Sequence, residues 1–249
     1  MQSKHIIAAI GATSLLFTAL PAFAQTTPPP TGAAFCTNLS NITSKINANV
    51  TTREQKIADH RTDVATKKTE RWASRDQQLS TKRIEADAKR AAKYAELDAK
   101  ATTDEQKAAV AQFRTDVEAA VVTRKAAVDA AVAAYRSGVD TALQAHVDAM
   151  SAAEATFKTS VDAAIAKAES DCANGIDGAT ARNTLRTSIT AARDAFKTAR
   201  KDNTLEGKRQ ELAAARKASI DAAMAAFRTT LEQAKVELKA ALPASTTAQ

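Results

Sequence analysis

Few side chains in this sequence have the types and spacing that chemistry requires. Outside its first ten residues the chain has two cysteines, Cys36 and Cys172, and two histidines, His60 and His146. The sequence contains no motif of a serine nucleophile, a phosphate-binding loop or a zinc-dependent hydrolase, and two isolated cysteines lack the paired spacing of a structural zinc site. We therefore expect a protein that is not an enzyme and that uses no cofactor.

The two cysteines predict one disulfide bond. Asp104 lies midway between Cys36 and Cys172 in the sequence. It also lies within two overlapping capping boxes that run from Thr102 to Gln106, which predict a helix start there. If the chain runs outward as a helix, turns at Asp104 and returns, the two sulfur atoms arrive at the same level. Because cysteines of an exported chain are usually oxidised, the pair would close this helical hairpin.

The start of the chain indicates export. Residues 1–24 combine a basic start, an apolar run from Ile6 to Leu20 and a small-residue cleavage site that ends at Ala24, as a secretory signal peptide does. The apolar run has about 15 residues, whereas a membrane-spanning helix needs roughly 20. We expect cleavage at about Ala24 and a protein that is secreted or periplasmic.

Proline marks both ends of the mature chain. The run from Pro28 to Pro30 predicts a stiff linker over residues 25–34. Pro243 predicts the end of the last helix, followed by a disordered tail over residues 243–249. No proline occurs between these two points, so residues 35–242 are predicted to form a single elongated helical domain.

Alanine dominates the composition. It supplies 60 of the 249 residues, more than half of the 45% that are hydrophobic, while aromatic residues make up only 4%. Six glycines and five prolines are too few for the turns of an all-β or α/β domain. A core made of alanine cannot fill a wide interior at native packing density. The composition therefore predicts an all-α protein of long, closely packed helices.

An eleven-residue repeat runs through residues 110–176. Its first position holds Val110, Val121, Val132 and Leu143, its eighth position is mostly valine, and alanine closes nearly every block. Eleven residues in three turns give about 3.67 residues per turn, so these positions form an apolar stripe that hardly drifts around the helix. The repeat predicts a long, nearly straight helix that packs as a coiled coil.

Further turn signals divide the domain into three helices. Glycines at positions 175 and 178, each after Asn or Asp, mark a second turn. We predict helices over about 37–101, 104–172 and 178–242, arranged as an elongated antiparallel three-helix coiled-coil bundle. Asn203 and Gly207 could split the third helix near residues 202–207. Residues 51–100, 101–172 and 173–249 carry net charges of +4, −4 and +5, which favours an acidic helix between two basic ones.

One constellation could bind a metal. In this layout His60, His146 and Asp202 fall at the same level, and both histidines lie on apolar faces, as a metal site or a pH-sensitive polar layer would require. Coincidence explains the same positions more simply, because a shift of one turn in register would separate them. We predict no metal site and keep the polar layer as the alternative.

Basic faces on the first and third helices are the best candidates for a binding surface. Acidic residues are interspersed and aromatic residues for stacking on bases are nearly absent, so we expect no specific nucleic acid. Trp72, beside Lys68, is better explained as core filling than as a binding anchor. The basic candidates are Lys67, Lys68, Lys82, Arg83, Lys89, Arg90, Lys197, Arg200, Lys201, Lys208 and Arg209.

These features predict a non-enzymatic exported coiled-coil protein. It would act as a structural spacer or protein-interaction rod in the cell envelope or the extracellular space, with a protein or cell-envelope partner. The alternative is a periplasmic holdase-type chaperone, or a binder of anionic polymers or membrane surfaces, that uses the basic faces. The sequence leaves the oligomeric state open.

Overall fold

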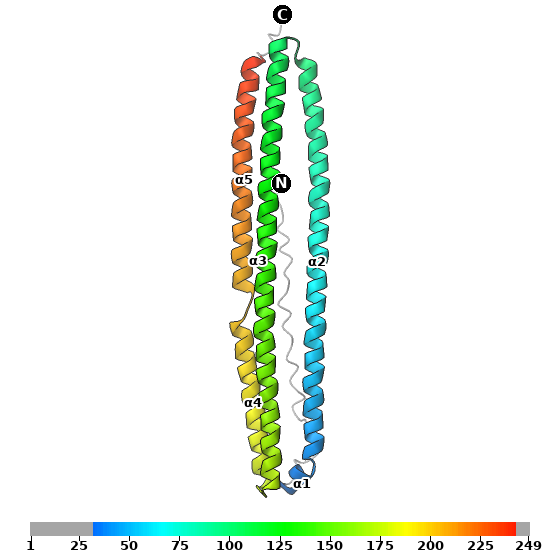
Figure 1. Ribbon diagram of the computed structural model, residues 1–249, viewed down its shortest axis with the longest axis vertical. Helices are drawn as coiled ribbons and strands as arrows, with labels where there is room; N and C mark the ends of the chain where they lie inside the picture. Colours follow the sequence, from blue (N-terminus) through cyan, green and yellow to red (C-terminus); the bar gives the residue numbers. More distant parts are fainter. Residues whose placement is uncertain (1–31, 243–249) are drawn as a thin grey trace, which may run out of the picture.

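The computed structural model describes residues 32–242, and all five elements in this range are α-helices (Figure 1). Three long helical columns run antiparallel, with α3 in the middle, α2 on one side and the α4–α5 pair on the other. This arrangement confirms the predicted all-α bundle of three long helices. The predicted signal peptide and tail lie outside the described residues. The helices are α1 (Gly32–Thr37), α2 (Leu39–Lys100), α3 (Asp104–Ala173), α4 (Gly178–Asp202) and α5 (Glu206–Ala241).

Side-chain caps fix both turns where the sequence predicts them. At the start of α3 the Thr103 hydroxyl accepts a hydrogen bond from the Gln106 amide at 3.3 Å, and the Gln106 side chain accepts one from the Thr103 amide at 3.3 Å. At the start of α4 an Asp177 carboxylate oxygen accepts from the amide of Thr180 at 3.1 Å. Gly175 makes the preceding turn with a φ of +74°, which glycine adopts without strain.

The third column is split, as predicted. The helix α4 ends at Asp202, and α5 begins at Glu206 after three residues of irregular chain. Opposite the start of α5, Gly138 of α3 provides the space that Leu212 needs: a Cβ atom at position 138 would lie 2.5 Å from a Leu212 methyl carbon. The unbroken helix α3 therefore supports both halves of the third column.

The short helix α1 was not predicted as a separate element, and it begins at Gly32, inside the predicted linker 25–34. The chain turns at Asn38, whose side-chain amide donates to the Ala34 carbonyl at 3.0 Å. The turn lets Phe35, only 2% exposed, enter the core and lets Cys36 reach Cys172. The two cysteines form the predicted disulfide, with their Cα atoms 5.6 Å apart.

Most of the buried side chains gather at the two ends of the described molecule. At the disulfide end, α1, α2, α3 and α4 share one apolar cluster, to which Phe35, Val161 and Leu185 belong. The opposite end has two more apolar clusters, one around Tyr94 and one around Val110, to which α2, α3 and α5 contribute. Valines of the first and eighth repeat positions enter both ends, which confirms the predicted apolar stripe of α3.

Candidate functional site

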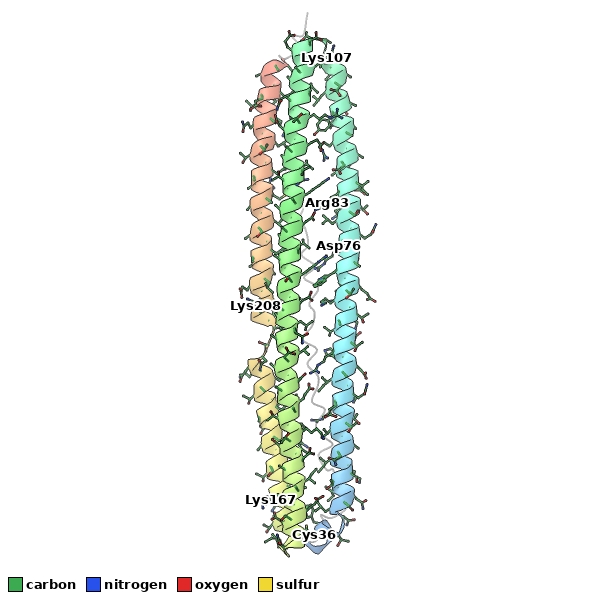
Figure 2. All side chains as sticks on the ribbon, viewed as in Figure 1. Cys36, Asp76, Arg83, Lys107, Lys167 and Lys208 are labelled. Atoms are coloured by element: carbon green, nitrogen blue, oxygen red, sulfur yellow. A yellow bond between two sulfur atoms is a disulfide. The ribbon has the colours of Figure 1, made fainter. Side chains whose placement is uncertain are left out.

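A series of ion pairs joins α2 to α3 between the two apolar ends. The backbone of α3 lies much closer to α4 and α5 than to α2, so long charged side chains span the wider gap. Asp76 and Arg83 of α2 lie on the side that faces α3 (Figure 2). We call this set the charged seam; its pairs are Arg61–Glu154, Lys68–Asp140, Asp76–Arg136, Arg83–Asp129, Asp87–Lys125 and Arg90–Glu118.

Three arginines of the charged seam hold their carboxylates in two-point contacts. Arg83 donates to the two oxygens of Asp129 at 2.7 and 3.1 Å. Arg90 donates to those of Glu118 at 2.6 and 3.2 Å, and Arg136 binds Asp76 in the same way. This paired geometry is the stronger form of the arginine–carboxylate contact and fixes how the two helices are aligned lengthwise.

The seam keeps three of its carboxylates, Asp76, Asp87 and Glu118, ionised. Hydrogen bonds from Arg136 lower the pKa of Asp76, and hydrogen bonds from Lys125 and Arg90 lower the pKa of Asp87. The pKa of Glu118 is lowered mainly by its hydrogen bond with Arg90. These groups therefore stay charged and paired throughout the neutral pH range.

Trp72 lies inside the charged seam rather than in an apolar core. Its ring lies 4.9 Å from the Lys68 Nζ and 5.2 Å from the Arg136 guanidinium carbon, both measured to the ring centroid. Both distances are typical of cation–π contacts. Trp72 thus contacts the cations of two neighbouring ion pairs. The prediction that Trp72 fills an apolar core is therefore wrong.

The structure divides the predicted basic faces into two groups. Of the six candidates on α2, Lys68, Arg83 and Arg90 point to α3 and belong to the charged seam. Lys82, Lys89 and Lys201 are exposed to solvent, and Arg200 is half-buried. The remaining candidates pair with acids of their own helices: Lys67 with Asp63, Lys197 with Asp194, Lys208 with Glu211 and Arg209 with Glu206.

The predicted complementarity of charge holds for only one side of α3. The ion pairs that the described residues of α4 and α5 make lie within each helix. Contact with α3 instead combines the apolar clusters with cation–π contacts. The guanidinium carbon of Arg124 lies 4.2 Å from the Phe227 ring centroid, and that of Arg216 lies 4.4 Å from the Tyr135 ring centroid.

His60 and His146 do not belong to a metal-binding cluster in the described structure. His146 is level with the break in the third column, as predicted, and its Nδ1 lies 2.6 Å from the Asn203 carbonyl oxygen. Asp202 is exposed and His60 is half-buried. Between residues 32 and 242 there is no group of three or more His, Cys, Asp or Glu side chains that could hold a metal ion. His146 therefore has a local role at the end of α4.

A shallow groove of about 640 Å³ runs between α3 and α5. Small side chains such as Ala119, Ala127 and Ala226 line it together with Phe227, and its polar lining includes Asp116, Arg124 and Glu237. Most of the surface that lines the groove is apolar.

Comparison with family models, curated proteins and solved structures finds no match for this chain. None of the helices described here is long and apolar enough to cross a membrane.

Proposed function

We propose that this protein is a non-enzymatic exported rod that acts as a structural spacer or protein-interaction rod in the cell envelope or the extracellular space. The observation that carries the proposal is the unbroken helix α3, whose 70 residues span about 105 Å at 1.5 Å per residue. Its predicted signal peptide and its disulfide agree with an oxidising compartment outside the cytoplasm.

The arrangement of contacts suits a rod that must keep its length. Apolar clusters lock the helices together at both ends, where a load would be applied. The disulfide Cys36–Cys172 prevents separation at one end, and the turn between α2 and α3 does so at the other. Between the ends the charged seam holds α2 alongside the antiparallel α3 without a thick core, so that few large side chains are needed.

Site-specific photocrosslinking in the producing cells tests the spacer against its alternative. A spacer contacts its partners at its ends, so a photoreactive residue at Ile176 or Glu105, in or beside the two terminal turns, should give protein adducts. The same residue at Lys82, exposed about two-thirds of the way along α2 and away from both ends, should give few. Adducts formed mainly at Lys82 would contradict the spacer and favour binding along the rod.

The exposed lysines support the alternative function. The protein would then either bind anionic polymers or membrane surfaces, or act as a periplasmic holdase-type chaperone. Lys82, Lys89 and Lys201 face solvent and have no ion pair in the described structure. Salt-dependent cosedimentation with anionic vesicles that a Lys82→Gln/Lys89→Gln variant loses would favour this function. Suppressed aggregation of an unfolded client protein would favour the holdase.

A further inference from the structure

The groove between α3 and α5 continues into an exposed surface of α3 with few charges. All residues that line the groove belong to α3 and α5. Between Ala119 and Ala134 the exposed residues of α3 are alanine, valine or threonine, apart from Asp129, which binds Arg83. Another helix can therefore cover this part of α3 without taking unpaired charges out of water.

Three charged side chains line the groove, and none of them belongs to an ion pair within residues 32–242. Asp116 and Glu237 each accept one hydrogen bond from a glutamine of their own helix, at 2.9 and 3.2 Å. Arg124 lies over the ring of Phe227. Two carboxylates and one guanidinium group thus remain able to pair with charges of a partner.

The spacing of two of these charges suits a second copy of the same chain. Asp116 and Arg124 lie four residues before and four residues after Ala120, which also lines the groove. In an antiparallel pair of α3 helices with a two-fold axis at Ala120, residues equally far from the axis face each other. Asp116 of each copy then lies level with Arg124 of the other, so that two pairs of opposite charge form.

The third charge, Glu237, comes to the same place. Phe227 contacts Arg124, and Ala234 shares an apolar cluster with Val117, so both contacts give the same antiparallel alignment of α5 with α3. In this alignment Glu237 lies level with residue 114 of its own chain. The two-fold axis places it level with residue 126 of the second copy, about 3 Å along the helix from Arg124. Arg124 therefore meets both groove carboxylates of the other copy.

We propose that the groove is a dimer interface, in which α3 of a second copy lies antiparallel along α3 with the two-fold axis at Ala120. The small side chains of Ala119, Ala120 and Thr123 let the two helices approach closely. Because Ala120 lies near one end of α3, the copies overlap only in part, and the dimer is about 160 Å long, with a disulfide near each outer end. This assembly does not depend on whether the rod acts as a spacer or as a binder.

Cysteine cross-linking of the oxidised, exported protein tests the position of the axis. Residue 120 of one copy meets residue 120 of the other, so Ala120→Cys should form a covalent dimer under mild oxidation. Ala130→Cys is the matched control, because it is more exposed on the same helix but should lie about 30 Å from its counterpart along the axis. Small-angle scattering of the wild-type dimer should give a length of about 160 Å.

Charge variants test the pairs across the interface. In sedimentation equilibrium, Arg124→Glu and Asp116→Arg should each weaken the dimer roughly tenfold or more, because each makes two pairs repulsive. An equimolar mixture of the two variants should dimerise again, since the new arginine of one faces the new glutamate of the other. Arg186→Glu, an exposed change on α4 outside the groove, should dimerise as the wild type does. Asp116→Arg leaves the contact of Arg124 with Phe227 in place, so it serves alone should Arg124→Glu fail to fold.

A wild type that sediments as a monomer at concentrations up to about 1 mM would overturn the proposal. So would a cross-link of Ala130→Cys that forms as fast as that of Ala120→Cys, or a dimer of about 105 Å, which would require full overlap of the two copies. A photoreactive residue at Thr230, in the groove, should capture a second copy in the producing cells. If it captured a different protein instead, the groove would belong to that partner and the proposal would be wrong.

Discussion

Reduction of the Cys36–Cys172 disulfide should cost this protein a large part of its stability. The bond joins residues 136 positions apart. On the chain-entropy model, a cross-link that closes a loop of this length stabilises the folded state by about 5 kcal/mol. This is comparable with the whole unfolding free energy of many domains, which is about 5–15 kcal/mol.

The effect of reduction should be local before it is global. At the disulfide end, Cys36 lies in the six-residue helix α1, which the turn at Asn38 separates from the long helix α2. At the opposite end, the three-residue turn between Lys100 and Asp104 joins α2 to α3 without any cross-link. Reduction should therefore release α1 and the first turns of α2, while the clusters around Tyr94 and Val110 stay protected.

Hydrogen exchange and urea denaturation measure the two parts of this prediction. Amides near Phe35 and Leu39 should exchange faster after reduction, whereas those near Val110 and Leu238 should keep their protection until the whole chain unfolds. A Cys36→Ser/Cys172→Ser variant should unfold at a lower urea concentration, as the reduced wild type does. A stability loss below about 1 kcal/mol, or equal deprotection at both ends, would refute the chain-entropy reasoning for this molecule.

Three further predictions concern glycines and titrating groups. Gly207→Ala should stabilise the protein by about 0.5–1 kcal/mol, because the position is helical and has open space around a Cβ. Gly175→Ala should destabilise the protein by about 1 kcal/mol, since the φ of Gly175 is +74°. Urea denaturation that ranks the two variants the other way would contradict both predictions. Burial raises the pKa of Tyr94 from 10.0 to about 12. The contribution of the neutral Tyr94 side chain to stability should therefore be complete below pH 10 and be lost as the pH rises toward 12. The unfolding free energy of Tyr94→Phe, measured over the same pH series, should not show this loss. The hydrogen bond from Arg90 lowers the pKa of Glu118, so its stabilisation is present above the ordinary glutamate pKa and is lost as the pH falls through the lowered value. In Arg90→Met the loss of stability at acid pH should be smaller than in the wild type by no more than about 1 kcal/mol, because Arg90 and Glu118 are both partly exposed. If the stability of Arg90→Met depended on pH as that of the wild type does, the Arg90–Glu118 pair would not be stabilising.

The helix ends and turns could be predicted because each rests on local chemistry. The capping box of Thr103 and Gln106, the cap at Asp177 and the left-handed Gly175 act within a few residues, so the sequence displays them directly. The break before Glu206 is of the same kind. The start at Gly32 was missed because α1 is held by the packing of Phe35 in the cluster and by the disulfide, which are contacts far away in the sequence.

The spacing between columns could not be predicted from composition. Ile57, Val64 and Leu79 follow each other at helical intervals and suggest an apolar contact of α2 with α3 along its whole length. In the structure these residues are only half-buried, and the fully buried side chains of α2 lie near its ends. Arginine and lysine side chains facing α3 hold the middle of the two helices apart, an effect that depends on which charges meet across the gap.

The partners in the charged seam, by contrast, follow from a signal that the sequence does contain. In an antiparallel hairpin closed by a disulfide, residues equally far from the turn lie opposite each other, and Cys36 and Cys172 place the midpoint at Asp104. Lys68 and Asp140 are equally far from Asp104, and so are Arg90 and Glu118; both pairs form. The other four pairs depart from this rule by about one or two helical turns, a distance that long flexible side chains can span.

Net charge indicates that two helices attract, but the disulfide sets the alignment that decides which residues meet. It follows that the seam and the disulfide specify the same register, so that a chain with mismatched seam charges should form the Cys36–Cys172 bond more slowly than the wild type.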